Sequence, residues 1–180
     1  MARNDRRVRA ALIRTAEALE FAELQAAAAA EAPGAWRWCA IASCMALQGA
    51  LVAALSGYDT ADPGDVLHPE AGPDLAKVAP IATLLRRASS GQVLNDPERL
   101  GAMSGAKRQA LALVELRNRA VHVDLSDAGL DLSDVPRLLP GPVRLMTHLV
   151  CLHPAFPAAS FQPWQGQIAR HLTALRDRVC

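Results

Sequence analysis

The stretch WCAIASCMALQGALVAALSGY, residues 38–58, decides the fold because it contains no charged side chain. Alanine and leucine dominate it, and both are strong helix formers. Two kinds of helix share this composition: one that crosses a membrane, for which the length nearly suffices, and one that other helices bury on all sides. Three polar side chains within the stretch favour the buried helix: Ser43, Gln48 and Ser56. We therefore expect the central helix of a bundle and no membrane as partner.

The composition of the whole chain predicts an all-α protein. Of its 180 residues, 51% are hydrophobic but only 4% are aromatic. Aromatic and β-branched residues, which favour strands, are scarce. Nineteen basic and 18 acidic residues leave a net charge of +1. This charge balance argues against an enzyme that acts on long nucleic-acid duplexes, but not against one that binds a short single strand at a local site.

A helical pattern precedes the apolar stretch. Apolar residues spaced by three and four predict a helix from Asn4 or Asp5 to about Ala30, and Glu-Ala-Pro-Gly at residues 31–34 ends it. The start of this helix is basic, which is typical of a solvated face but also suits contacts with phosphates. The arginines concerned are Arg3, Arg6, Arg7, Arg9 and Arg14.

Further helical patterns follow a loop rich in glycine, proline and aspartate at residues 57–73. We expect a helix from Asp74 to Leu85 that Pro80 breaks or kinks, and a longer helix from about Ala106. The pattern as a whole predicts an up-and-down bundle of about five to six helices in a single domain, residues 1–180. We expect residues 153–180 to form a C-terminal helical extension that either packs back on the bundle or swaps onto a partner. Its last helix is expected to span about Trp164 to Val179, with Ile168, Leu172 and Leu175 as its apolar stripe.

The helix that begins near Ala106 ends in LRNRAVH, residues 116–122. Arg117 carries a permanent planar cation suited to phosphate, and His122 can exchange a proton near neutral pH. Asn118 adds an amide that donates and accepts hydrogen bonds. On an ideal helix Arg117 and His122 lie about 140° apart. They can share one pocket only if the helix frays before His122 or if a second protomer completes the site.

Written as R-N-x-x-x-H at the end of a helix, Arg117, Asn118 and His122 resemble the signature of the HEPN superfamily. A second pattern, Trp-Arg-Trp at residues 36–38 with Ala-Leu-Gln-Gly-Ala-Leu at residues 46–51, is similar to that of uncharacterised bacterial HEPN-like proteins. The resemblance covers most of residues 1–152. It implies an all-helical HEPN-like bundle that forms a homodimer with paired motifs. Apart from the resemblance, Gln48 in a buried helix needs a hydrogen-bond partner, for which its symmetry mate at a dimer interface is one candidate.

The resemblance implies a metal-independent endoribonuclease that cleaves single-stranded RNA by attack of a 2′-hydroxyl on the adjacent phosphorus. His122 then acts as general base or acid, Arg117 offsets charge on the phosphoryl oxygens, and Asn118 orients a phosphate or the imidazole. Arg119 is the expected contact for flanking RNA phosphates. The biological setting implied is defence, stress or a toxin–antitoxin pair, with a cognate antitoxin as a second partner.

Two other interpretations stay open. Some HEPN proteins are inactive modules, so the chain could instead bind nucleotide, RNA or a protein partner without cleaving anything. The second interpretation is a purely structural role for the motif. In this case Arg117 pairs with Glu115 or with an acidic loop, and His122 only terminates a helix near its negative end.

The cysteines and histidines predict no metal site and no cofactor. None of the cysteines forms a C-x-x-C pair or stands at zinc-finger spacing from a histidine, so a zinc site is not expected. Cys39, Cys44 and Cys151 lie in apolar runs and fit small buried side chains. The charged N-terminus lacks the pattern of a signal peptide, and we therefore expect a cytoplasmic protein.

Overall fold

The computed structural model describes residues 3–58, 61–68, 77–94, 99–121, 131–152 and 158–179, and over these residues it confirms the predicted all-α fold. A 3₁₀ turn (Pro63–Asp65) and a π-helical turn (Thr147–Cys151) accompany the α-helices. The helices are α1 (Arg3–Ala28), α2 (Ala35–Leu55), α3 (Ile81–Ala88), α4 (Ser104–Val121), α5 (Val135–Leu138), α6 (Pro140–Met146) and α7 (Ala158–Val179).

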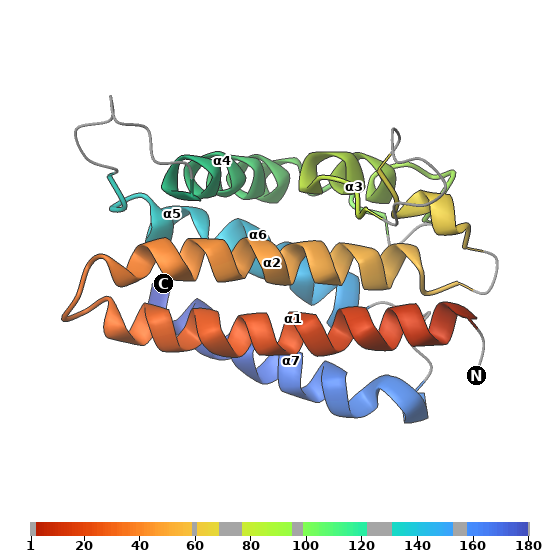
Figure 1. Ribbon diagram of the computed structural model, residues 1–180, viewed down its shortest axis with the longest axis horizontal. Helices are drawn as coiled ribbons and strands as arrows, with labels where there is room; N and C mark the ends of the chain where they lie inside the picture. The colour runs from red at the N-terminus through yellow and green to blue at the C-terminus, as the bar shows by residue number, and fades with distance from the viewer. Residues whose placement is uncertain are drawn as a thin grey trace.

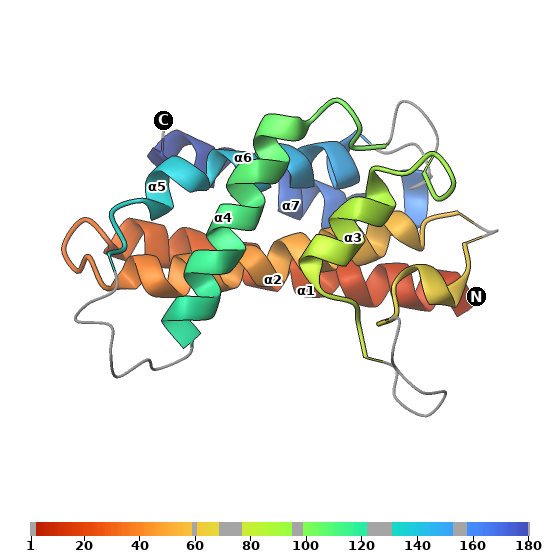
Figure 2. The ribbon, with the colours of Figure 1, turned by 90° about the horizontal axis from the view of Figure 1, so that it is seen from above.

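The helices stack in layers around α2. Figure 1 shows α3 and α4 on one side of α2, and α1 with α7 on the other side. Helices α1 and α2 run antiparallel as a hairpin, whereas α3 and α4 lie across α2 when the molecule is seen from above (Figure 2). The up-and-down order therefore applies to α1 and α2, and the next two helices cross them.

Small residues allow α1 and α2 to approach closely. A Cβ atom at Gly49 of α2 would collide with Oγ1 of Thr15 on α1 and would lie 3.1 Å from the carbonyl oxygen of Ala11. The Thr15 hydroxyl is fully buried at this contact and donates a hydrogen bond of 2.8 Å to that same carbonyl oxygen. Glycine at this position is therefore a requirement of the hairpin, because any larger side chain would separate the helices.

Helix α2 is the central buried helix that the charge-free stretch predicts. By length and composition alone it could cross a membrane, but 72% of its apolar window is buried inside the protein. The position of Gln48 in a buried helix predicts a hydrogen-bond partner, and its symmetry mate in a dimer is one candidate. Its side-chain amide instead donates to the backbone oxygen of Ala79 in the same chain at 3.0 Å, so this polar group is satisfied within one protomer.

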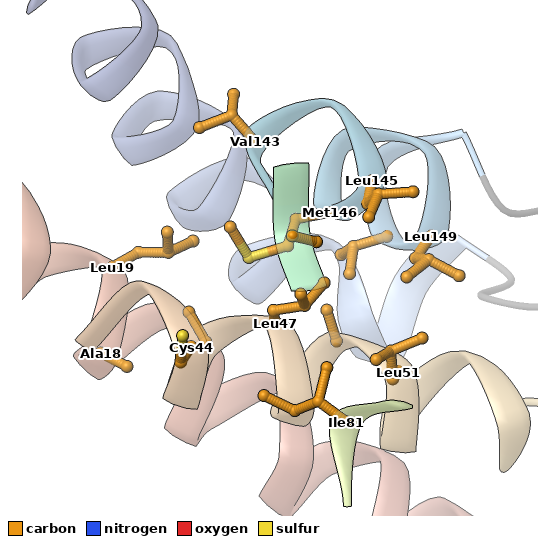
Figure 3. Close-up of a cluster of buried hydrophobic side chains, with 14 of the residues drawn as sticks. Ala18, Leu19, Cys44, Leu47, Leu51, Ile81, Val143, Leu145, Met146 and Leu149 are labelled. Atoms are coloured by element: carbon orange, nitrogen blue, oxygen red, sulfur yellow. The ribbon is translucent and has the colours of Figure 1, made fainter. Parts of the chain in front are cut away.

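One hydrophobic cluster joins the layers. In Figure 3 side chains from α1, α2, α3 and α6 converge: Leu47 of α2 lies below Met146, with Leu19 of α1 to its left and Leu51 to its right. Leu19, Leu47, Leu51 and Met146 are all fully buried. Burial of leucine-sized side chains contributes about 1.5–3 kcal/mol each, so this cluster supplies much of the driving force that fixes α2 between its neighbours.

The start of α3 differs from the prediction. Its expected residues 74–76 lie outside the described part of the chain, and Val78 is extended, paired with Leu67 in an isolated antiparallel bridge. Helix α3 begins only at Ile81, with Pro80 as its N-cap residue. Proline disfavours the helical conformation in the residue before it, so Pro80 sets the start of the helix rather than a kink within it.

Helix α7 begins earlier than the prolines suggest. It starts at Ala158 rather than at Trp164, with Pro163 inside it. Proline near the first turns removes few helical hydrogen bonds, and buried Phe161 anchors this end in the core. The extension packs back on the bundle, where His171 and Glu23 of α1 form a contact of 2.8 Å, and the predicted stripe of Ile168, Leu172 and Leu175 is buried.

Candidate functional site at the C-terminal end of helix α4

Helix α4 carries three of the predicted site residues in its last turns. Arg117 and Asn118 are half-buried, and Arg119 is exposed. Arg117 lies on the same side of α4 as the buried residues Leu113 and Leu116, so its side chain is turned toward α2. Arg119 is about 200° further around the helix and points away from that interface. The structure thus separates the two arginines of the motif.

Arg117 meets a buried thiol on α2. Burial raises the pKa of the Cys44 thiol to about 11, while the charge of Arg117 and a hydrogen bond from its guanidinium lower that pKa in part. Desolvation is the larger effect, so the thiol is protonated and uncharged at neutral pH. The guanidinium is therefore held by a neutral, weak acceptor.

No carboxylate within the described part of the chain forms an ion pair with Arg117. Glu115, the partner that the sequence suggested, is an exposed residue elsewhere on the helix surface. A guanidinium has five N–H donors, and a single sulfur uses little of that capacity. A guanidinium at such a half-buried position can bind an anion through charge-assisted hydrogen bonds.

His122, the predicted general base or acid, lies outside the described residues, which end at Val121 in this helix. Its relation to Arg117 therefore stays a prediction. Helix α4 ends at Val121 in the described part of the chain, immediately before the histidine.

The two helices that carry Arg117 and Cys44 also expose large apolar side chains. On α2, Trp38 and Met45 are two turns apart on one face, and they are 51% and 62% exposed. Val121, at the end of α4, is also 51% exposed. Large apolar side chains gathered on a surface are typical of contacts with another molecule.

Cys39 and Cys44 are buried free thiols, as the sequence predicts. The sequence predicts that Cys151 is buried as well, but this thiol is only half-buried. Burial raises the pKa of Cys39 to about 12, although the nearby Ser43 side chain lowers it in part. Both buried thiols are therefore poor nucleophiles and poor metal ligands at neutral pH. Across the described ranges no three His, Cys, Asp or Glu side chains cluster in a way that could hold a metal ion.

A second group of basic residues was not predicted. Arg99, Arg144, His148 and Arg176 line one pocket at the opposite end of α4, although they come from a loop, α6, the π-helical turn and α7. No spacing in the sequence links all of these positions, so no motif could have indicated them. The four-residue spacing of Arg144 and His148 was the only available sign that two of them share a face.

No family model, no curated protein and no solved structure matches this chain. The resemblance to the HEPN superfamily therefore rests on the residues quoted from the sequence alone.

Proposed function

We propose that the protein is a metal-independent endoribonuclease of the HEPN type, which cleaves single-stranded RNA at a site built around Arg117, Asn118 and His122. The observation that carries the proposal is the environment of Arg117. A half-buried guanidinium lies beside the neutral thiol of Cys44, and a phosphate is an anion that its planar set of donors fits.

The reaction is a transesterification. The RNA 2′-oxygen attacks the adjacent phosphorus, the bond to the 5′-oxygen of the next nucleotide breaks, and the products are a 2′,3′-cyclic phosphate and a 5′-hydroxyl. His122 accepts the proton of the 2′-hydroxyl or donates one to the leaving 5′-oxygen. Arg117 stabilises the charge that builds on the non-bridging oxygens, and Asn118 orients the phosphate or the imidazole. Exposed Arg119 contacts a flanking phosphate.

A homodimer fits this site better than a monomer. Trp38 and Met45 of α2 and Val121 of α4 are exposed apolar side chains on the two helices that carry Cys44 and Arg117, so a second copy packed on these helices would bury them. A second copy would also bring two motifs together, which removes the conflict between the helical positions of Arg117 and His122. In a toxin–antitoxin setting, a cognate antitoxin would have to cover this same face.

The alternative is a non-catalytic module that binds RNA, nucleotide or a protein partner. One observation favours it: the guanidinium of Arg117 hydrogen-bonds Cys44, which is buried on α2, so this arginine also helps to hold α4 against α2. In that case Arg117 positions helices and His122 takes no part in chemistry.

The test is cleavage of a fluorescent single-stranded RNA in buffer with EDTA, with the product ends identified by mass spectrometry. The proposal expects cyclic-phosphate ends from the wild type, none from His122→Ala, and unchanged cleavage by Arg108→Ala, whose exposed arginine lies on the same helix. An RNA with a single 2′-deoxy nucleotide at the cleaved position should resist the enzyme, since the attacking oxygen is absent.

Equal cleavage by the wild type and His122→Ala would contradict the proposal, because the activity would then come from a contaminant or another site. RNA binding without cleavage, measured by fluorescence anisotropy and equal in the wild type and His122→Ala, would establish the non-catalytic alternative.

A further inference from the structure

A pocket of about 870 Å³ lies where the loop before α4 meets α6, the π-helical turn and α7. Its volume is within the range of small-molecule sites, about 300–1,000 Å³. Figure 2 shows the first turns of α4 beside α6, the region from which this pocket opens. The pocket is about 20 Å along α4 from Arg117, since thirteen residues of helix separate Ser104 from that arginine. It is therefore separate from the motif.

The polar side chains of the pocket are predominantly cationic. Arg99, Arg144 and Arg176 reach it from three different segments, and His148 and Thr147 reach it from the π-helical turn. No Asp or Glu side chain is part of its lining among the described residues. Asp177, adjacent in sequence, lies 3.3 Å from Arg176, but both side chains are more than half exposed, so solvent screens this pair.

The rest of the lining is apolar and aliphatic. It consists of Gly101, Ala102, Met103, Pro140, Val143 and Leu152. Leu152 is 69% exposed, although it ends a helical segment whose preceding residues Leu149 and Val150 are fully buried. An aliphatic surface beside three arginines matches a molecule with an apolar body and an anionic head group.

Backbone geometry contributes to this arrangement. Residues Thr147–Cys151 form a π-helical turn directly after α6. Such turns are rare and occur often at functional sites, because the extra residue rotates the side chains that follow it. Here the turn carries Thr147 and His148 at the pocket while Leu149 and Val150 remain in the core.

We propose that this pocket binds a small amphipathic anion, in which an aliphatic chain lies on the apolar lining and a phosphate or carboxylate head group is held by Arg144 and Arg176. A nucleotide or an RNA strand fits less well, because the described lining contains no aromatic side chain on which a base could stack. The binding does not depend on the ribonuclease site, so either proposal can fail without the other.

The test is isothermal titration calorimetry with decyl phosphate and decanoate, both below their micelle concentrations, compared with inorganic phosphate and decanol. The proposal expects saturable binding of one decyl phosphate or one decanoate per chain, and the tighter of the two identifies the head group. Inorganic phosphate and decanol should each bind at least roughly tenfold more weakly, because each supplies only half of the interaction.

Two variants locate the binding. The double variant Arg144→Gln/Arg176→Gln should weaken it by roughly tenfold or more, whereas Arg178→Gln, an exposed arginine in the same last turn of α7, should leave it unchanged. Ala102→Trp places a large side chain in the pocket from an exposed turn and should abolish binding without a loss of stability. Circular dichroism and the Tm confirm that each variant is folded.

Three results would overturn the proposal. The first is no binding of either amphiphile to the wild type. The second is full binding in the double variant or in Ala102→Trp. The third is inorganic phosphate that binds as tightly as decyl phosphate, which would reduce the pocket to a surface anion contact.

Discussion

The two ends of α4 use arginine in opposite ways. At the C-terminal end one arginine, Arg117, turns inward and is held against the buried thiol of Cys44. At the N-terminal end the arginines come from other segments, and exposed Arg144 and Arg176 surround an aliphatic lining. In the first arrangement, the motif around Arg117 is local in sequence and can be recognised there, although its contact with Cys44 cannot. The second exists only after folding, so its chemistry is visible only in the structure.

The replacement Arg117→Met should have the largest effect on function. Methionine keeps an unbranched apolar stem beside Cys44 but removes the charge. We expect RNA cleavage to fall by about 100–1,000-fold, the usual cost of losing one group that stabilises the transition state. Initial rates on a single-stranded RNA, measured in EDTA, provide the comparison with wild type.

The same variant separates chemistry from structure at this end of α4. Arg108→Met is the matched control, since Arg108 is an exposed arginine on the same helix. If Arg117→Met lowers the Tm by many degrees and RNA binding disappears together with cleavage, Arg117 is a structural residue and the contrast between the two ends of α4 is lost.

At the other end of α4, Gly141 of α6 controls how closely the two helices approach. A Cβ atom there would lie 2.7 Å from the carbonyl oxygen of Ala106. Gly141→Val should therefore lower the free energy of unfolding by about 1–3 kcal/mol through overpacking, and it should also weaken ligand binding in the nearby pocket. Urea denaturation measures the first effect and calorimetry the second.

Gly166 of α7 provides a control of opposite sign. An added Cβ meets nothing within 4 Å there. Gly166→Ala should raise the free energy of unfolding by about 0.5–1 kcal/mol, because alanine loses less conformational entropy in a helix than glycine does. Equal destabilisation by both substitutions would show that the space around Gly141 is not the cause.

The sequence predicts helices well where composition and periodicity act together. The charge-free stretch identifies α2, and the stripe of Ile168, Leu172 and Leu175 identifies the buried face of α7. The errors occur at prolines, because proline can start a helix, as Pro80 does, or be tolerated inside one, as Pro163 is. Local sequence does not determine which of the two occurs, since the core contacts of Phe161 decide the second case.

For the site, periodicity places Arg117 on a helix face but does not identify the residue that it contacts. Cys44 is distant in sequence, and only the packing of α4 on α2 brings the two together. The pocket is even harder to predict from the sequence. Arg99, Arg144 and Arg176 lie on three segments whose proximity depends on the whole bundle.

The pH dependence of the free energy of unfolding tests the contact of Cys44 with the C-terminal end of α4. Burial raises its pKa from the ordinary value of 9.0 to about 11, so the unfolded chain loses this proton first. The stabilising contribution of the protonated thiol is complete below pH 9 and is lost as the pH rises toward about 11. We expect the free energy of unfolding of the wild type, relative to Cys44→Ala, to fall across that window.

Arg117→Met sharpens this measurement. Without the guanidinium, which lowers the pKa of Cys44, the decline with pH should extend to higher pH than in the wild type. Urea denaturation at a series of pH values gives the curves of the wild type and of Arg117→Met, with Cys180 replaced by serine in both proteins. Coincident curves would mean that Arg117 does not act on this thiol.

An effect of similarly small size concerns how the N-terminal end of α4 is attached to the segment after α3. Lys107 donates a hydrogen bond of 3.1 Å to the hydroxyl of Ser89, which follows α3. Lys107→Met should cost about 0.5–1.5 kcal/mol of the free energy of unfolding, the usual net value of such a bond. The neighbouring exposed Arg108→Met should change the free energy of unfolding by less than about 0.5 kcal/mol.

A double-mutant cycle of Lys107→Met with Ser89→Ala isolates the interaction between these two side chains. A coupling near zero would mean that apolar packing around Gly141 alone holds this end, and that the pocket owes its shape to α6 rather than to α3.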